Sequence, residues 1–363
     1  MMLSDLGAEV VKVEHPHGGD TARGNGPYTR GYSSYFLSIN RGKKSMTLDL
    51  ATEAGRDLLL DLAKHADVLV ENFVPGAMDR FGLGCDAVMA ASPRLVYCSI
   101  SGFGQNGPYA RMPALDVIVQ GMGGIMSITG EPGGSPMRPG ASMGDIAAGL
   151  FAAVGILSAL VERAVSGRGQ YIDMSMMDCQ VAVQENAFAR FFATGQTPGP
   201  LGTRHPVFTP FQAFEASDGW IVVAIVGGRN DQWPLFCAAI DRVDLIDDPR
   251  YADGGLRTEH YDTLGPILTQ ALEQRPAAEW LETFRALERP CGPVNGIDAV
   301  AADPQIAARE MIVERPTADG ATVKLVNTPI KLSRTPGRIQ SLSPDLGEHT
   351  QAVLAEWLGQ AAP

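Results

Sequence analysis

Apolar positions in the first hundred residues fall into short runs separated by stretches with helical spacing. Alternating or β-branched runs predict strands at 8–14, 45–50, 67–71 and 95–100. The spacing of apolar residues predicts helices at 52–64 and 75–91 between the later strands. Strands that alternate with helices of this length are typical of parallel βαβ units. We therefore expect an α/β fold with a Rossmann-like parallel sheet.

The longest apolar stretch, residues 146–161, contains no charged residue. It predicts a helix that is buried on most faces, with Asp145 in its first turn. A membrane span needs ~20 apolar residues, and Gly149, Gly155 and Ser158 interrupt this shorter run. We therefore expect a core helix and no membrane span.

The rest of the chain divides into recognisable elements. Gly167 and Gly169 are typical of a helix end. The predicted strands and helices that follow are a strand at 170–174, a helix at 178–194, a hairpin turn at 214–219, a strand at 220–226, helices at 231–240, 263–274 and 277–287, a strand at 323–327 and a helix at 350–358. This order predicts a large domain, 1–190 with 325–363, and a smaller α+β domain, 208–300. Residues 191–207 and 301–324 are predicted linkers. The first residues have the pattern of a helix end, so we expect an upstream strand and most of a helix to be missing.

Composition narrows the function. The chain has 363 residues, 19% of them charged, and a formal net charge of −12, which argues against a nucleic-acid surface. Its five scattered cysteines form no C-x-x-C pair, so we expect no metal site and a reducing, cytoplasmic location.

Asp145 is the candidate with the sharpest alternatives. A carboxylate in the first turn of a helix is stabilised by unpaired backbone N–H groups and by the helix dipole. It is therefore either an ordinary N-cap or a nucleophile presented at an anion-binding helix end. Position alone favours the cap, because Asp is a preferred N-cap residue.

Other motifs are weaker. Residues 102–107 match G-x-G-x-x-G, but prolines follow and Asp116 comes too soon for a ribose contact, so we expect a loop and no dinucleotide site. Basic residues at 41–44 and Arg80 lie on loops near strand ends and suit phosphate groups, although solvated surface charges explain each one alone equally well. His205 is the one histidine worth attention, and no G-x-S-x-G elbow indicates a serine hydrolase.

Several longer motifs resemble the class III CoA-transferases in the same order along essentially the whole chain. They are DLGAEVVKVE at 5–14, NRGKKSMTLD at 40–49, ENFVPGAMDR at 71–80, SGFGQNGPY at 101–109, GD at 144–145, GRGQ at 167–170, CGPV at 291–294 and GEHT at 347–350. The resemblance implies that Asp145 is the nucleophile and that CoA migrates through aspartyl anhydride and aspartyl-CoA thioester intermediates. Gly144 would then let substrate approach the backbone closely.

The resemblance also implies the rest of the site. Acyl-CoA and a carboxylic acid would be the substrates, with no tightly bound cofactor, in a homodimer of two interlocked rings. Arg80 would face phosphate, and Phe73 and Met176 would pack against pantetheine or adenine. The implied CoA contacts are His15, Leu48, Asn72, Phe73, Ala77, Arg80 and Met176.

Three departures keep alternatives open. The family's opening strand and its Ala-Gly-Pro loop are absent. If the protein really begins at Met1, this favours a catalytically inactive CoA-binding dimer. Residues 202–210 stand where formyl-CoA transferase has a glycine-rich loop, so its specificity does not carry over. Leu115 stands where the related α-methylacyl-CoA racemases have a catalytic histidine, and leucine can neither remove nor return a proton. A transferase is preferred to a racemase. Its donor and acceptor stay open, with selectivity expected near 202–210 and 226–229.

Overall fold

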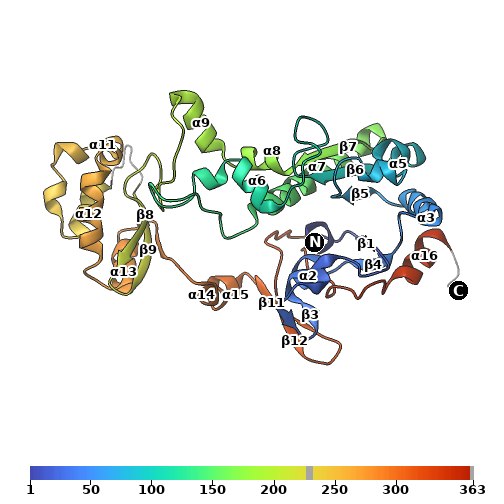
Figure 1. Ribbon diagram of the computed structural model, residues 1–363. Coiled ribbons are helices and arrows are strands. Elements are labelled where there is room, and N and C mark those ends of the chain that lie inside the picture. The colour runs from blue at the N-terminus through green and yellow to red at the C-terminus, as the bar shows by residue number, and fades with distance from the viewer. Residues whose placement is uncertain (226–231, 360–363) are drawn as a thin grey trace. The chain divides into compact units, whose positions relative to one another are not determined.

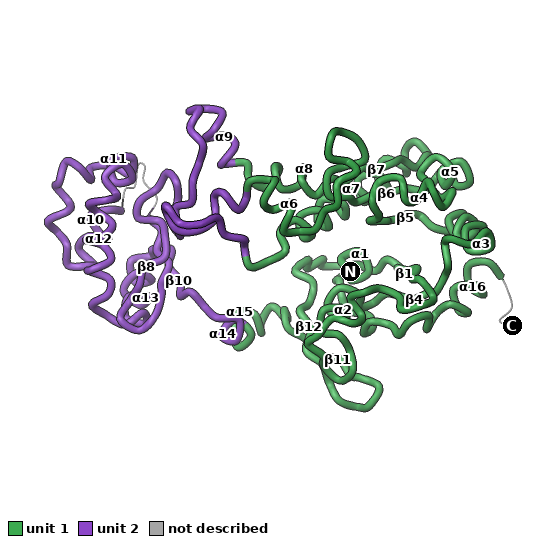
Figure 2. Tube along the Cα trace, in the orientation of Figure 1, with its two compact units in different colours: residues 1–124, 140–185, 301–363 green, residues 125–139, 186–300 purple. Residues whose placement is uncertain are grey.

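The computed structural model describes residues 1–225 and 232–359 and divides the chain into two compact units (Figure 2). Unit 1 comprises residues 1–124, 140–185 and 301–363, and unit 2 comprises 125–139 and 186–300. Residues 125–139 therefore belong with the small unit, although the sequence analysis assigned them to the large domain. The 226–229 segment lies outside the described residues.

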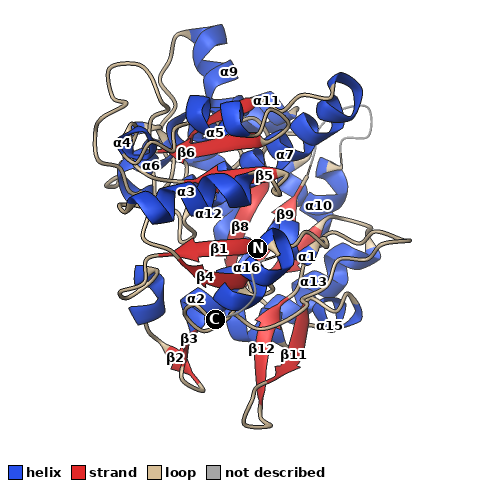
Figure 3. Cartoon of the chain, turned by 90° about the vertical axis from the view of Figure 1, so that its right-hand side faces the viewer, coloured by secondary structure: helices blue, strands red, loops and turns tan. Residues whose placement is uncertain are grey.

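Unit 1 is built on parallel strands, which confirms the predicted α/β class. β1 (Val11–Glu14) pairs with β4 (Lys44–Thr47), and β6 (Val96–Ser101) lies between β5 (Val68–Glu71) and β7 (Tyr171–Ser175) (Figure 1). The strands form two separate sheets (Figure 3), whereas the sequence analysis expected one.

The two sheets share one apolar core. Leu59, Met78 and Leu83 pack with Leu69 of β5, and Leu48, directly after β4, packs against the same cluster. This packing holds the carboxyl ends of β4 and β5 in one structural unit.

Most predicted elements of unit 1 are present. Its remaining helices and strands are α1 (Met2–Asp5), η1 (Thr21–Gly24), β2 (Tyr28–Thr29), β3 (Tyr32–Ser33), α2 (Ser34–Asn40), α3 (Glu53–Ala63), α4 (Ala77–Arg80), α5 (Cys85–Ala91), α6 (Asp116–Met122), η2 (Ile125–Ser127, the first residues of unit 2), α7 (Met143–Ser166), α8 (Met176–Ala182), α9 (Glu185–Thr194, continuing into unit 2), α14 (Ile297–Ala301, which begins in unit 2), α15 (Pro304–Ala308), β11 (Ile312–Pro316), β12 (Thr322–Val326) and α16 (Thr350–Leu358). The helix predicted at 75–91 is broken into α4 and α5, because Gly82 takes a φ of 71°. The helix predicted at 178–194 is broken into α8 and α9.

α7 corrects the expectation of a helix buried on most faces. Small residues bury one face, among them Ala148, Ala152 and Ala159, and the helix contacts β6 and β7. The opposite face carries an exposed row of apolar side chains that we call the α7 stripe: Ile146, Leu150, Val154, Leu157 and Val161. By length and composition the 24-residue helix is apolar enough to cross a membrane, a test that core helices also pass.

Unit 2 is the α+β part. Its antiparallel sheet has the order β10 (Cys291–Pro293), β9 (Gly219–Ala224), β8 (Phe211–Ala216). This confirms a hairpin, but its turn is at 217–218, because residues 214–216 of the predicted turn belong to β8 and 219 to β9. The helices are α10 (Trp233–Ala239), η3 (Val243–Leu245), η4 (Pro249–Tyr251), α11 (Gly254–Glu259), α12 (Tyr261–Leu272) and α13 (Ala277–Ala286). Alternate residues of β9, Ile221 and Val223, join a core of aromatic and leucine side chains from these helices.

Candidate active site

Asp145 is exposed and is the third residue of α7, so it does not occupy the N-cap position, which falls on Ser142. The N–H groups of this turn already have partners. Asp116 Oδ1 accepts from the N–H of Gly144 at 2.8 Å and from that of Asp145 at 3.4 Å, and the Met143 N–H donates to Ala141 O at 2.9 Å. The expectation that the N–H groups of this turn are unpaired is therefore wrong.

Three side chains from α6 and α8 hold this first turn. The amide of Gln120 donates to Asp116 Oδ2 at 2.7 Å and to Ala141 O at 3.4 Å, and Gln180 donates to Met143 O at 2.9 Å. Both glutamines are completely buried, whereas Asp116 is half-buried. This arrangement was not predicted from the sequence, because Asp116 was considered only as a ribose ligand. Asp116 and Gln120 lie one helical turn apart in the sequence, and this spacing could have indicated that their side chains interact.

Gly144 gives Asp116 access to the helix. A Cβ at this position would lie 3.0 Å from Asp116 Oδ1 and 3.4 Å from Met176 Cε. The side of Gly144 on which other residues carry a side chain therefore faces Asp116 and Met176. The sequence-based expectation was that substrate would approach the backbone there. The predicted CoA contact Met176 is thereby brought beside the first turn of α7.

A second group of predicted contacts follows β5. Asn72 and Phe73 are exposed, and the Phe73 ring meets Phe81 edge-on at 6.4 Å between centroids. The Phe73 N–H donates to Glu71 Oε2 at 2.7 Å. Burial raises the pKa of Glu71. The loop that carries Asn72 and Phe73 is thus fixed at its start by a partly desolvated carboxylate.

The remaining predicted contacts differ in exposure. Ala77 is buried at the start of α4, and Arg80 is exposed at its end, with Nη1 3.9 Å from the place of a Cβ on Gly76. Leu48 packs in the shared apolar core. His15 is exposed directly after β1, where its Nδ1 accepts from the His17 N–H at 3.1 Å.

These positions share one topological feature. His15, Leu48, Asn72 and Met176 each come directly after a parallel strand, namely β1, β4, β5 and β7. Ligands of open α/β sheets bind outside the carboxyl ends of the strands. Loop 102–107, after β6, lies at a strand end too, and Gln105 N–H donates to both carboxylate oxygens of Asp173 on β7, at 3.2 and 3.0 Å. No helix starts within it, as predicted.

The basic residues at 41–44 have structural partners, which corrects their interpretation as phosphate ligands. Arg41 is buried and pairs with Asp5 at 2.8 Å, and Lys44 pairs with Glu9 at 2.6 Å. Lys43 donates to Asn40 Oδ1 at 2.9 Å, and burial, followed by the charge of Lys12, lowers its pKa to about 8.

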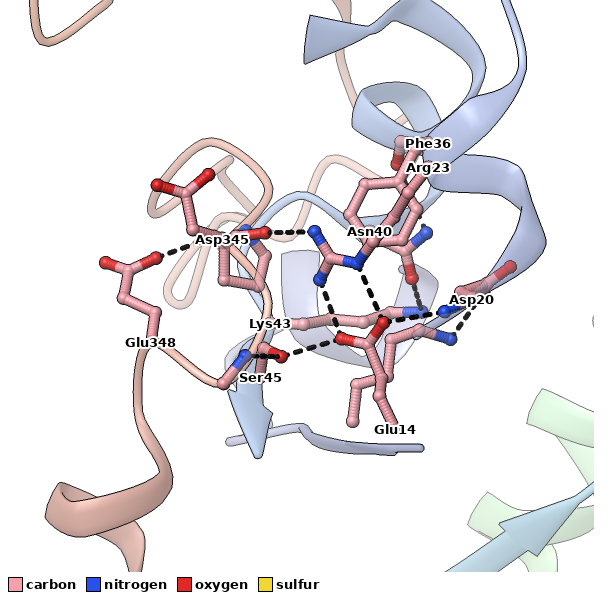
Figure 4. A network of polar contacts seen from close by, with 12 residues as sticks. Glu14, Asp20, Arg23, Phe36, Asn40, Lys43, Ser45, Asp345 and Glu348 are labelled. Atoms are coloured by element: carbon pink, nitrogen blue, oxygen red, sulfur yellow. Dashed lines mark hydrogen bonds and ion pairs between the residues drawn. The ribbon is translucent and has the colours of Figure 1, made fainter. Parts of the chain in front are cut away.

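A buried carboxylate organises the neighbouring network (Figure 4). Glu14, at the end of β1, accepts from Arg23 at 2.7 and 2.8 Å and from the Ser45 hydroxyl at 2.7 Å. Arg23 also lies over the Phe36 ring, 4.1 Å from its centroid. Burial alone would raise the pKa of Glu14, but hydrogen bonds from Arg23, Ser45 and the Asp20 N–H outweigh it and hold the pKa below its ordinary value.

His205 has a structural environment. Its ring stacks on Phe208 at 4.9 Å and on Phe211 at 4.8 Å, and Nδ1 accepts from the N–H groups of Val207 and Phe208. Within residues 1–225 and 232–359, no group of three or more His, Cys, Asp or Glu is arranged to hold a metal ion.

Comparison with known proteins decides the family. Residues 1–350 match the family described as CoA-transferase family III. The chain belongs to that family. This CoA-transferase is 39% identical over 362 residues to the succinate–glutarate CoA-transferase of Agrobacterium fabrum, covering 98% of this chain and 90% of the relative.

Two further comparisons agree. The CoA-transferase is 40% identical over 333 residues to the acetyl-CoA:oxalate CoA-transferase of Acetobacter aceti, covering 92% of this chain and 84% of the relative. A crystal structure of a CAIB/BAIF family protein from Brucella suis matches with a TM-score of 0.85 and 39% identity, covering 98% of this chain and 93% of that one. The predicted family, fold class and enzyme class are confirmed.

Proposed function

We propose that this enzyme moves CoA from an acyl-CoA to a dicarboxylic acid, with Asp145 as the nucleophile. The observation that carries the proposal is the position of Asp145 on α7: it is exposed, and the capping of its helix is carried out by Asp116. Asp145 is thus an exposed carboxylate on a first turn that Asp116 holds in place. In a CoA-transferase, a presented carboxylate can form the covalent intermediate.

The proposed chemistry has four steps. An Asp145 oxygen attacks the thioester carbonyl and expels CoA thiolate, which leaves a mixed anhydride. The thiolate then attacks the Asp145 carbonyl, releases the donor carboxylate and forms an aspartyl-CoA thioester. The acceptor carboxylate attacks that thioester, again expelling thiolate and forming a second anhydride. Thiolate attack on the acceptor carbonyl gives the new acyl-CoA and restores the Asp145 carboxylate.

We propose that CoA lies along the carboxyl ends of the parallel strands. The exposed Arg80 suits its phosphates, and the exposed face of Phe73 suits an adenine or pantetheine contact. Met176, beside Gly144, would guide the thioester end toward Asp145. Leu48 and Ala77 would support this surface from beneath, with Asn72 and His15 at its rim.

The names of the relatives suggest the acceptor. One is a succinate–glutarate and the other an acetyl-CoA:oxalate CoA-transferase, so dicarboxylic acids recur as substrates. We propose a dicarboxylic acid acceptor here. The same names favour a transferase over the racemase alternative.

We further propose a cytoplasmic homodimer. The α7 stripe offers a continuous apolar face, and exposed apolar patches of this kind are typical of protein interfaces. The five free cysteines suit a reducing compartment.

The test is mass spectrometry of the intact chain. Incubation with succinyl-CoA or acetyl-CoA and then hydroxylamine should convert Asp145 alone to a hydroxamate, and Asp145→Asn should lose this label together with at least ~1,000-fold in kcat. Asp262→Asn is the matched control, since Asp262 is an exposed first-turn carboxylate of α12. Normal turnover by Asp145→Asn would refute the proposal. Deuterium exchange at the acyl α-carbon without CoA transfer would indicate a racemase, and neither activity would indicate a binding protein.

A further inference from the structure

We infer that Asp116 is a positioning residue whose negative charge promotes acylation of Asp145. This inference rests on the proposed covalent role of Asp145 and goes beyond it. The decisive geometry is that one oxygen of Asp116 contacts the backbone N–H of Asp145 itself, as well as that of Gly144.

Asp116 is held in place from two sides. Its Oδ1 contacts the first turn of α7, and its Oδ2 accepts from Gln120, which is completely buried. The carboxylate therefore has a fixed place, and two acidic side chains occupy one helix N-terminus. A helix end stabilises carboxylates through its N–H groups and dipole. Here Asp116 accepts from two N–H groups of the turn, and Asp145 on the same turn is the proposed nucleophile.

The charge of Asp116 acts differently on the two states of Asp145. In its resting state Asp145 is a carboxylate and is repelled by Asp116. As its oxygen bonds to the thioester carbon and the C–S bond breaks, the negative charge passes to the departing sulfur, and the anhydride at Asp145 is neutral. Repulsion is relieved along this path. An interaction that favours the transition state over the ground state raises kcat.

The test separates charge from shape. In Asp116→Asn the amide oxygen can still accept from Gly144, while the new NH2 group faces Gln120. Among the described residues, Gln120 Oε1 has no hydrogen-bond partner, so its amide can turn to accept from that NH2. The substitution should therefore keep the fold and remove only the charge.

We expect Asp116→Asn to lower kcat about tenfold with succinyl-CoA and glutarate, or with the fastest pair found for the wild type, which corresponds to ~1.4 kcal/mol. KM for the acyl-CoA should stay within twofold. The fraction of chain trapped by hydroxylamine at saturating acyl-CoA should fall, because the acylated state loses its advantage. A loss of kcat smaller than threefold would overturn the inference.

The matched control is Asp303→Asn. Asp303 is the N-cap residue of α15 and, like Asp116, accepts from two N–H groups of a first turn, those of Gln305 at 2.7 Å and Ile306 at 3.3 Å. It should leave kcat and trapping unchanged. If Asp116→Asn lowers the melting temperature, kcat is no longer comparable, because it would count inactive chains. The rate of acylation in a single turnover, counted per chain that hydroxylamine can trap, is then compared in place of kcat. Full activity of Asp145→Asn would instead refute the proposed nucleophile, so the two failures are distinguishable.

Discussion

At the residue scale, a long-range contact holds the first turn of α7. Sequence position favoured the cap for Asp145, because local patterns treat every first-turn Asp alike. One side chain that contacts the turn is that of Asp116, which precedes Asp145 by 29 positions. No local periodicity connects the two residues, so sequence spacing could not predict this contact.

The contact between Asp116 and the first turn of α7 can also be tested by a substitution at Gly144. Gly144→Ala would place a Cβ 3.0 Å from Asp116 Oδ1 and displace that carboxylate from the helix end. We expect kcat to fall roughly tenfold, because small displacements of positioning groups have large kinetic effects. Steady-state kinetics with trapping of the acyl-enzyme measures this. Gly155→Ala is the control within the same helix, since its Cβ would meet Ile172 at an ordinary 3.7 Å, and it should raise stability by up to ~1 kcal/mol without lowering kcat.

At the element scale, periodicity predicted well where a segment had one buried face. The hairpin of β8 and β9 and the closing helix α16 fall where expected. The helix predicted at 75–91 breaks at Gly82, because a positive φ there interrupts an otherwise helical pattern. β11 lies in the predicted linker 301–324, since its pairing with β12 is what makes it a strand.

Charged residues were harder to predict than apolar ones. The sequence places Arg41 and Lys44 on a loop near strand ends, where phosphate ligands are expected, yet their partners are Asp5, Glu9 and Glu356, from other parts of the chain. Whether a basic residue meets a ligand or a carboxylate depends on tertiary contacts that sequence spacing does not contain.

The Glu14 network predicts a pH-dependent stability. Glu14→Gln should lower the free energy of unfolding at pH 7 by roughly 3–5 kcal/mol, because it leaves the Arg23 guanidinium without its buried counter-charge. The folded pKa of Glu14 lies below its ordinary value, so this wild-type advantage is complete above about pH 4.3 and shrinks as the pH falls further. Urea denaturation at several pH values measures it.

The comparison variant for that experiment is Glu9→Gln. Glu9 pairs with Lys44 on the surface, with 41% of its side chain exposed. Exposed pairs contribute less than ~1 kcal/mol, so its effect should be small at every pH. Equal losses of unfolding free energy in the two variants would contradict the assignment of Glu14 as the buried carboxylate that holds this network together.

At the scale of the whole molecule, composition and element order gave the α/β class and two units, and the comparisons confirmed the family. The split of the parallel strands into two sheets could not be predicted, because pairing is not encoded in any single strand. The exposed face of α7 was missed for a related reason: an apolar face looks the same in sequence whether or not the rest of its own chain covers it.

The α7 stripe predicts where a homodimer would be disrupted. Val154→Glu should weaken association at least ~100-fold, since it buries an unpaired charge in an apolar interface. Light scattering after size-exclusion chromatography measures the change in mass. Val243→Glu is the control, because Val243 on unit 2 is as exposed as Val154, at 63% against 62%, and lies off the stripe. A monomeric wild type would refute the dimer outright.

The proposed homodimer would make the enzyme's behaviour depend on its concentration. Asp145 and the stripe belong to one uninterrupted helix, so dissociation of the proposed dimer on dilution would expose to water the same helix that carries the proposed nucleophile. Stability that depends on association follows mass action. Turnover per chain should therefore decline as the enzyme is diluted, and assays run at trace amounts would understate a catalyst that is fully competent at cellular abundance.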